Sequence, residues 1–150
     1  MVGAGAIGGV TAAFLKIGGW NPQLVCKHQE IVGQTKTEGL QISGLRGSHT
    51  VKLEAVKDIS DLTGPLDLVF LATKATDCLQ AAEALLPCLK NDAVVVSLQN
   101  GICEEYLSNI LGRNRVLGCV VGWGATVHEP GRLQKTSEGE FVVGALPGEE

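Results

Sequence analysis

The chain begins MVGAGAIGGV, which places Gly3, Gly5 and Gly8 in the spacing G-x-G-x-x-G. This spacing is typical of the turn between the first strand and the first helix of dinucleotide-binding folds. Gly3 would permit the tight turn, Gly5 would let the backbone approach a pyrophosphate, and Gly8 would let the helix pack close to the strand. The motif alone is weak evidence, so its meaning depends on the residues around it.

The residues after the glycines supply the helix and the second strand that the motif requires. Apolar side chains recur at helical spacing at Ile7, Val10, Phe14 and Ile17. Gly18-Gly19 marks the end of this helix, and Leu24–Cys26 favours a short buried strand. This context favours a dinucleotide site over a purely structural turn. The residues that would form the site are Gly3, Ala4, Gly5, Ala6, Ile7 and Gly8.

The strand before the motif is short. Only Met1 and Val2 precede Gly3, whereas a strand usually runs about 5 or 6 residues. We therefore expect the chain to be a fragment truncated at both ends, or a gene product with a clipped start. We also expect marginal stability, because a shortened central strand would lose hydrogen bonds to two neighbours.

Strand and helix patterns alternate along the rest of the chain. Apolar runs predict strands at 66–72, 93–98 and 116–121, and helical spacing predicts helices at 78–89 and 103–110. We expect an α/β fold, with a Rossmann-like, doubly wound, mainly parallel sheet and helices on both faces. Residues 1–150 would form one dinucleotide-binding domain.

Two hairpins are expected outside this alternation. Short β-prone runs punctuated by glycines lie between 35 and 56, where Leu40–Ile42 would pair with Thr50–Leu53. In the tail, Leu133–Lys135 would pair with Phe141–Val143.

Charge and length limit the partners of the chain. Its 150 residues include 16 acidic and 12 basic side chains, for a net charge of −4, and there is no long basic run. This balance argues against a nucleic acid or an anionic membrane and favours a small molecule. No stretch approaches about 18 consecutive apolar residues, and no secretory signal is present, so we expect a cytoplasmic protein.

The cysteines and histidines do not predict a metal site. The five cysteines are Cys26, Cys78, Cys88, Cys103 and Cys119, and they lack C-x-x-C spacing. We interpret them as small buried hydrophobes in a reducing compartment. The histidines His28, His49 and His128 have no ligand-like spacing, and His128 is interpreted as structural.

The residue that ends the second strand bears on the choice of cofactor. In NAD-preferring folds an Asp or Glu about 20 residues after the glycines binds the ribose 2′-hydroxyl, whereas a basic residue suits a 2′-phosphate. Lys27 stands at this place and favours NADP(H). Glu30 is the carboxylate that would favour NAD(H) instead.

Two further polar stretches, Leu71–Lys74 and Ser97–Gly101, follow the ends of predicted strands. In open α/β sheets the ligand crevice lies outside the carboxyl ends of the strands. Lys74 and Asn100 are therefore expected to face a bound nicotinamide and its substrate. Either one alone would be an ordinary polar cap.

Together these motifs resemble the N-terminal domain of the ketopantoate reductase (2-dehydropantoate 2-reductase) family. The stretches that carry the resemblance are GAGAIGG, ATKATD, QNGI and HEPG, and they extend over nearly the whole chain. The resemblance implies that the glycine turn holds NADPH and that Lys27 meets its 2′-phosphate. It also implies that Lys74 contacts the cofactor and that Asn100 lies between cofactor and substrate.

The resemblance further implies an NADP-dependent oxidoreductase activity that this chain would provide only in part. In the family, hydride passes from NADPH to the ketone of a 2-keto acid, giving pantoate in pantothenate biosynthesis, and the general acid is a lysine in a helical C-terminal domain. We expect this chain to lack that domain, with its sequence ending where the domain would begin. We therefore expect residues 1–150 to bind the cofactor without completing the substrate site, and a homodimer to form through the missing domain.

Two alternatives remain open. The chain could be an NADP(H)-binding module without catalysis, or part of another dehydrogenase with this two-domain plan that acts on a different 2-keto or 3-hydroxy acid. The sequence shows no Ser/His/Asp order that would suggest a hydrolase.

Overall fold

The computed structural model describes residues 1–99 and 102–148. The helices are α1 (Ala6–Ile17), α2 (Gln29–Thr37), α3 (Cys78–Leu85) and α4 (Glu104–Leu111). The strands are β1 (Gln23–Val25), β2 (Leu40–Gly44), β3 (His49–Val51), β4 (Glu54–Val56), β5 (Leu66–Leu71), β6 (Leu89–Ser97), β7 (Val116–Val121), β8 (Ala125–Glu129), β9 (Arg132–Lys135) and β10 (Phe141–Ala145). Short 3-10 helices are η1 (Ile59–Asp61), η2 (Ala75–Asp77), η3 (Leu86–Cys88) and η4 (Arg113–Arg115).

The main sheet has the order β4-β1-Val2-β5-β6-β7-β10. Val2 forms parallel bridges to Val25 of β1 and to Leu71 of β5, and so joins the two halves of the sheet. All neighbours along β4 to β7 are parallel, and only β10 runs antiparallel, along β7. The predicted mainly parallel, doubly wound sheet is confirmed, and its order reverses direction at Val2.

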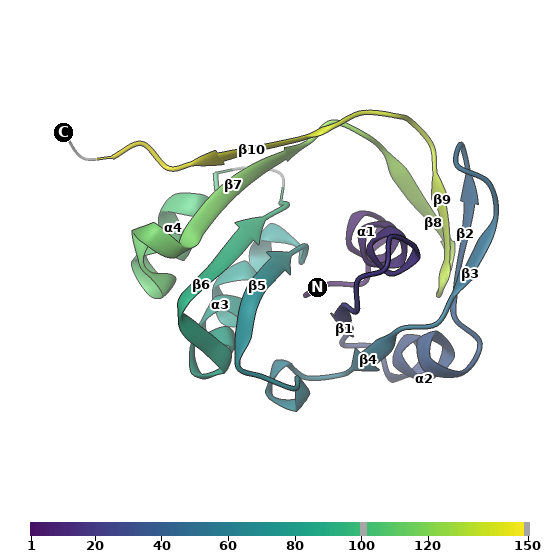
Figure 1. The fold of residues 1–150 in the computed structure, drawn as a ribbon, viewed down its shortest axis with the longest axis horizontal. Helices are drawn as coiled ribbons and strands as arrows, with labels where there is room; N and C mark the ends of the chain where they lie inside the picture. Colours follow the sequence, from purple (N-terminus) through teal and green to yellow (C-terminus); the bar gives the residue numbers. More distant parts are fainter. Residues whose placement is uncertain (100–101, 149–150) are drawn as a thin grey trace.

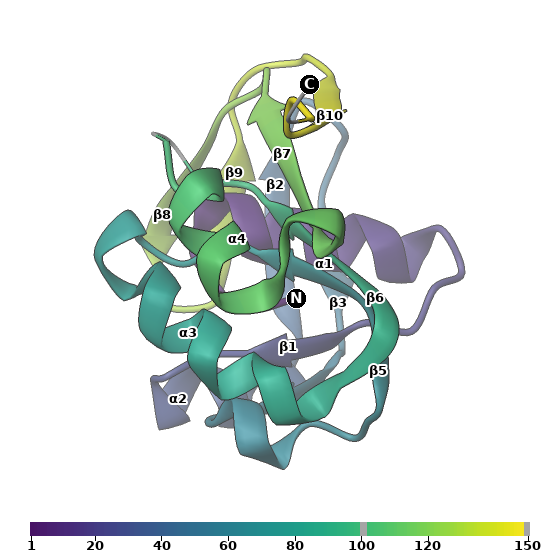
Figure 2. The same cartoon turned by 90° about the vertical axis from the view of Figure 1, so that its left-hand side faces the viewer.

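Helices cover both faces of the main sheet. Helices α3 and α4 lie against one face (Figure 2). Leu85 and Leu107 of these helices share a buried cluster with Val69, Leu71 and Val95 of the sheet. Helix α1 lies on the other face (Figure 1). Burying this many aliphatic side chains supplies most of the driving force for folding.

A second sheet, in the order β3-β2-β9-β8, covers the far side of α1, so that this helix lies between two sheets (Figure 1). Leu40, Ile42 and Leu133 of this sheet share a buried cluster with Val10 and Ala13 of α1. A Cβ placed at Gly9 would overlap the end of the Leu133 side chain, so the glycine lets the helix approach the sheet closely. Helix α1 therefore packs against the main sheet on one side and against the second sheet on the other.

Most predicted elements are confirmed. The helix after the glycines, the strands at 66–71 and 116–121, the helix at 104–111 and the hairpin of β2 with β3 are all present. The third helix ends at Leu85 rather than Leu89, because η3 follows it and β6 already begins at Leu89. Strand β5 is buried only at its carboxyl half, since Leu68 is 53% exposed.

The predicted hairpin in the tail is wrong. Leu133–Lys135 of β9 pairs with β8 and β2, whereas Phe141–Val143 of β10 pairs with β7 of the main sheet. The reason is burial, because Leu133 packs in the same apolar cluster as α1. Residues 136–140 then lead the chain back to the main sheet, where the Gly122 N–H donates to the Glu140 carbonyl at 2.8 Å. Helix α2 and strand β4 were not predicted at all.

The interpretation of the cysteines holds for Cys26, Cys78, Cys103 and Cys119, which are buried, whereas Cys88 is only partly buried. Burial raises the pKa of the Cys26 and Cys119 thiols.

Within the ranges described, no helix is both long and apolar enough to cross a membrane.

An ion-pair network ties β9 to the turn between β2 and β3. Lys135 of β9 is 5% exposed, and its ammonium donates to the Glu138 carboxylate at 2.7 Å and lies 5.5 Å from the centre of the Trp123 ring. Arg46 donates two hydrogen bonds of 3.2 Å to the same carboxylate. These hydrogen bonds, first from Arg46 and then from Lys135, lower the pKa of Glu138 from 4.5 to about 2.

We expect Glu138→Gln to lower the free energy of unfolding at about pH 7, because the buried Lys135 loses its counter-charge. A carboxylate whose folded-state pKa is depressed stabilises the fold above its unfolded pKa, and this stabilisation is lost as the pH falls through the folded pKa. The difference between wild type and variant should therefore shrink between pH 4.5 and about 2. Urea denaturation across this pH range measures it.

Glu129→Gln is the matched control, because the Glu129–Arg132 pair is more than half exposed on both sides and should contribute little at any pH. A Glu138→Gln difference that is the same at both ends of the pH range would contradict the network.

Candidate functional site

The glycine turn is held at the centre of the main sheet by backbone hydrogen bonds on both sides. On the β5 side, the Val2 N–H donates to the Phe70 carbonyl at 2.9 Å, and the Ala72 N–H donates to the Val2 carbonyl at 2.8 Å. On the β1 side, Val25 N–H donates to Met1, and Gly3 N–H donates to Val25 at 3.0 Å. Two residues before the glycines are thus enough to place the turn at the carboxyl edge of the sheet.

The three motif glycines are in different environments. Gly3 has a φ of +108°, and a Cβ there would lie 2.6 Å from the Ala72 carbonyl oxygen. A Cβ at Gly8 would overlap the Gly3 carbonyl oxygen, so this glycine lets α1 pack against the strand end. A Cβ at Gly5 would meet no protein atom within 4 Å. Gly5 therefore offers an open side where another molecule can approach the backbone closely.

Helix α1 begins directly behind this open side. Gly5 is its N-cap, and the first intrahelical bond runs from the Gly9 N–H to the Gly5 carbonyl at 2.8 Å. The N–H groups of Ala6, Ile7 and Gly8 precede this bond and so have no acceptor within the helix. No acidic side chain lies in the first turn. The helix start is therefore suited to an anion.

Polar side chains gather where β5 and β6 end. The Gln99 amide donates to the Thr73 hydroxyl at 2.7 Å, and the Ser97 hydroxyl donates to the Gln99 side-chain oxygen at 3.3 Å. Ser97 and Gln99 are buried, whereas Lys74, which follows Thr73, is exposed. Thr73 and Gln99 lie in the two polar stretches that follow the predicted strands, but no role was predicted for either. Their buried polar position at a strand end was the available signal.

Lys27 lies two residues after the end of β1, at the carboxyl edge of the main sheet, and contacts the segment that follows β5. Its ammonium donates to the Asp77 carboxylate at 3.4 Å, and the two side chains are 71% and 45% exposed. Asp77 ends η2, for which Lys74 is the N-cap. The structure thus brings the glycine turn, Lys27 and Lys74 to one edge of the main sheet. The remaining predicted site residue, Asn100, lies outside the described residues.

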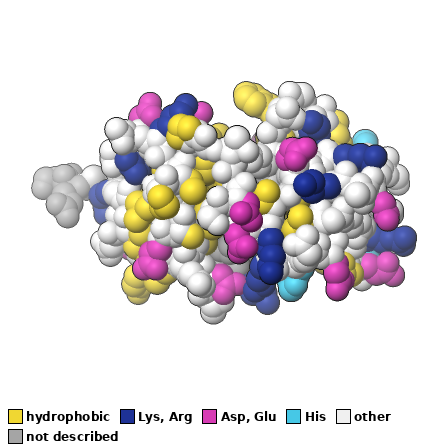
Figure 3. All heavy atoms as spheres, turned by 90° about the horizontal axis from the view of Figure 1, so that it is seen from below, with side chains coloured by type: hydrophobic (Ala, Val, Ile, Leu, Met, Phe, Trp, Pro, Cys, Tyr) yellow, Lys and Arg dark blue, Asp and Glu magenta, His cyan; other side chains and the backbone are white. Residues whose placement is uncertain are grey.

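Two of the surface hollows formed by the described residues bear on the site. The first, of about 490 Å³, is formed by the end of β1, the start of α2, the residue after β4 and the turn between β8 and β9; we call it the β1–β4 hollow. Lys27 and Glu30 both line it. In Figure 3, basic and acidic side chains are interspersed over the half of the molecule that holds α2.

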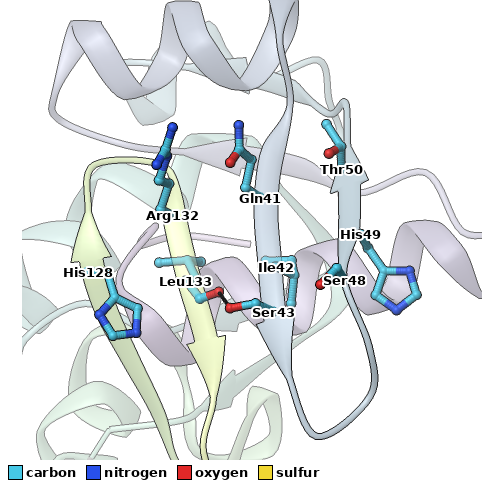
Figure 4. A pocket seen from close by; sticks show the side chains of 9 residues that line it. All are labelled: Gln41, Ile42, Ser43, Ser48, His49, Thr50, His128, Arg132 and Leu133. Atoms are coloured by element: carbon cyan, nitrogen blue, oxygen red, sulfur yellow. Dashed lines mark hydrogen bonds between the residues drawn. The ribbon is translucent and has the colours of Figure 1, made fainter.

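The second hollow, of about 420 Å³, lies on the second sheet (Figure 4). Gln41, His49 and Arg132 are among its lining residues, and no residue of the glycine turn is. His128 lines both hollows and is exposed, and one of its ring nitrogens lies 2.5 Å from the Gln134 side-chain oxygen. Among the described residues, no group of three or more His, Cys, Asp or Glu side chains could hold a metal ion.

A parallel sheet that reverses its order at Val2, with a glycine turn and a helix start at that point, defines a Rossmann-like domain. The family model for ketopantoate reductase PanE/ApbA matches residues 1–148, and the chain belongs to this family. The chain is 30% identical over 148 residues to the 2-dehydropantoate 2-reductase of Archaeoglobus fulgidus, an alignment that covers 99% of this chain and 47% of that protein. The chain thus spans about half the length of such relatives.

Solved structures give the same result. The crystal structure of 2-dehydropantoate 2-reductase from Geobacter metallireducens aligns with a TM-score of 0.85 and 27% identity, over 99% of this chain and 50% of that chain. D-mandelate dehydrogenase, solved in a ternary structure with NADH and anilino(oxo)acetate, aligns with a TM-score of 0.79 and 26% identity, over 95% of this chain and 47% of that chain. The predicted resemblance to the family is confirmed.

The different environments of Gly5 and Gly8 predict that alanine at the two positions will have very different effects on the stability of the fold. Gly8→Ala should lower the free energy of unfolding by about 1 to 3 kcal/mol, because its Cβ overlaps backbone that cannot move without disturbing Val2. Gly5→Ala, the matched control, should change it by about 1 kcal/mol at most, since the Cβ enters open space at an N-cap. Guanidinium denaturation of both variants measures this, and equal losses would contradict the described turn.

Proposed function

We propose that this chain binds NADPH across the carboxyl edge of the main sheet, as the cofactor-binding part of a 2-keto acid reductase. The observation that carries the proposal is the open side of Gly5 in front of the first turn of α1. A pyrophosphate needs close backbone approach, free N–H groups and a partial positive charge, and all three are available here. The residues present therefore fit the cofactor.

The Ala4–Gly8 backbone would hold the pyrophosphate. The helix start presents N–H groups without acceptors, and no carboxylate in the first turn opposes the phosphate charge. Gly5→Ala should therefore weaken binding far more than it affects folding, because its Cβ would occupy the space that the pyrophosphate needs.

Lys27 would face the 2′-phosphate of the adenosine. It lies at the end of β1, beside the β1–β4 hollow, which is where the adenosine ribose lies in folds of this type. A phosphate there would compete with Asp77 for the Lys27 ammonium, whose present bond of 3.4 Å is long and solvent-exposed.

The nicotinamide end would lie over the ends of β5 and β6. When bound, NADPH supplies a hydride from C4 of its nicotinamide for reduction of the substrate ketone. The hydrogen-bonded Ser97–Gln99–Thr73 chain would fix the floor of this site, and Lys74 would place a positive charge beside it. We propose that Asn100 bonds the substrate, and that the general acid and the remaining substrate contacts come from a helical C-terminal domain, as the family resemblance implies.

NADH is the second candidate cofactor, and one observation favours it: Glu30 lines the same hollow as Lys27 and could accept a hydrogen bond from a ribose 2′-hydroxyl. D-mandelate dehydrogenase, similar in fold to this chain, has NADH bound. NADPH requires a positive side chain in the hollow to face its 2′-phosphate, whereas NADH requires a carboxylate to bind its 2′-hydroxyl.

Cofactor titration decides between them. A solvent-exposed lysine facing a phosphate should contribute roughly 1 to 2 kcal/mol, or about a tenfold preference for NADPH over NADH. Fluorescence titration of the wild type should show this preference, and Lys27→Glu should abolish or reverse it. Lys52→Glu, a charge change at an exposed lysine outside the hollow, should leave it unchanged.

Equal or tighter binding of NADH by the wild type would overturn the assignment to NADPH. Failure of both cofactors to bind a folded chain would overturn the site itself.

A further inference from the structure

The β1–β4 hollow contains a second lysine that the sequence analysis did not consider. Lys57 directly follows β4, and it lines the hollow together with Lys27. In the sequence the two lysines are 30 positions apart, and no local motif connects them.

Strand register places the two lysines at the same edge. Strands β1 and β4 are parallel, with Val25 opposite Val56, and the Cys26 N–H donates to the Val56 carbonyl at 3.0 Å. Lys27 and Lys57 therefore follow the carboxyl ends of neighbouring strands, where ligands bind in open parallel sheets.

The charges around the two lysines differ. Lys27 already has a counter-charge in Asp77, at 3.4 Å. Among the described residues, no carboxylate lies within ion-pair distance of Lys57. Of the two acidic side chains in the hollow, Glu129 is paired with Arg132 at 3.5 Å, which leaves Glu30 as the charge that opposes an anion. Among the described residues that line the hollow, Lys57 and Glu30 are thus the charged side chains without an ion-pair partner.

We infer that Lys57 is a specificity-determining residue that binds the 2′-phosphate of the cofactor together with Lys27. This inference rests on the proposed binding of NADPH at this edge. Lys57 supplies the uncompensated cation, while Lys27 must first exchange Asp77 for the phosphate. The carboxylate of Glu30 repels the 2′-phosphate and so reduces the preference of the hollow for a phosphorylated ribose.

The test measures the ratio of dissociation constants for NADH and NADPH. Lys57→Gln should lower this ratio about two- to fivefold by weakening NADPH binding alone, as expected for one exposed charge pair. Lys57→Arg should keep most of the preference because the charge remains. Glu30→Gln should raise the ratio, and added salt should lower it in the wild type, because these charges are solvent-exposed.

Lys52→Gln is the matched control, since Lys52 is exposed and lies before β4, at the opposite end of the strand from Lys57. It should leave the ratio unchanged, and thermal unfolding should be unaffected by either exposed substitution. A wild type that prefers NADPH, with a ratio that Lys57→Gln does not change, would overturn the role of Lys57 and leave the proposed function intact. A wild type that prefers NADH would overturn both.

Discussion

The backbone hydrogen bonds that hold Met1–Gly3 between β1 and β5 are the constraint on which the rest of the structure depends. Val2 is the only link between β4-β1 and β5-β6-β7-β10 in the described main sheet, and its side chain is 3% exposed. Because the sheet reverses its order at this residue, the turn that follows must open at the point where ligands bind in such folds. The position of the site is thus a consequence of strand pairing.

The glycine turn connects this pairing to the packing of the whole domain. Gly3 and Gly8 bring the turn against Ala72 at the end of β5, and Gly9 brings α1 against Leu133 of the second sheet. The helix consequently lies between two sheets, and it begins at the carboxyl edge of the main sheet. Gly5 is left open because these neighbouring contacts already determine the path of the chain. A turn held by such contacts, with one open side, favours binding, since little conformational entropy remains to be lost.

The sequence predicted those helices and strands whose apolar residues recur with a clear helix or strand spacing. The apolar run of β5 and the helical spacing of α1 and α4 were sufficient to place these elements. Helix α2 was missed because QEIVGQTKT has only Ile31 and Val32 as large apolar residues, and β4 because three residues carry no readable period. The prediction for the tail failed for another reason: β9 and β10 are neighbours in sequence, but β9 pairs with β8 and with the distant β2, whereas β10 pairs with β7 in the other sheet. In the candidate site, the glycines, Lys27 and Lys74 were predicted from motifs, whereas the proposal for Lys57 and the contact of Lys27 with Asp77 needed the strand register and the fold.

The central claim is that a dinucleotide binds at the edge organised by the glycine turn. Amide chemical-shift mapping by NMR during titration with NADPH tests it most directly. We predict that the largest changes occur at Gly3–Gly8, Lys27, Thr73 and Gln99, with little change at Gln41, Thr50 and Arg132 around the hollow of the second sheet. Changes centred on the second sheet, with the glycine turn unaffected at saturation, would contradict the account.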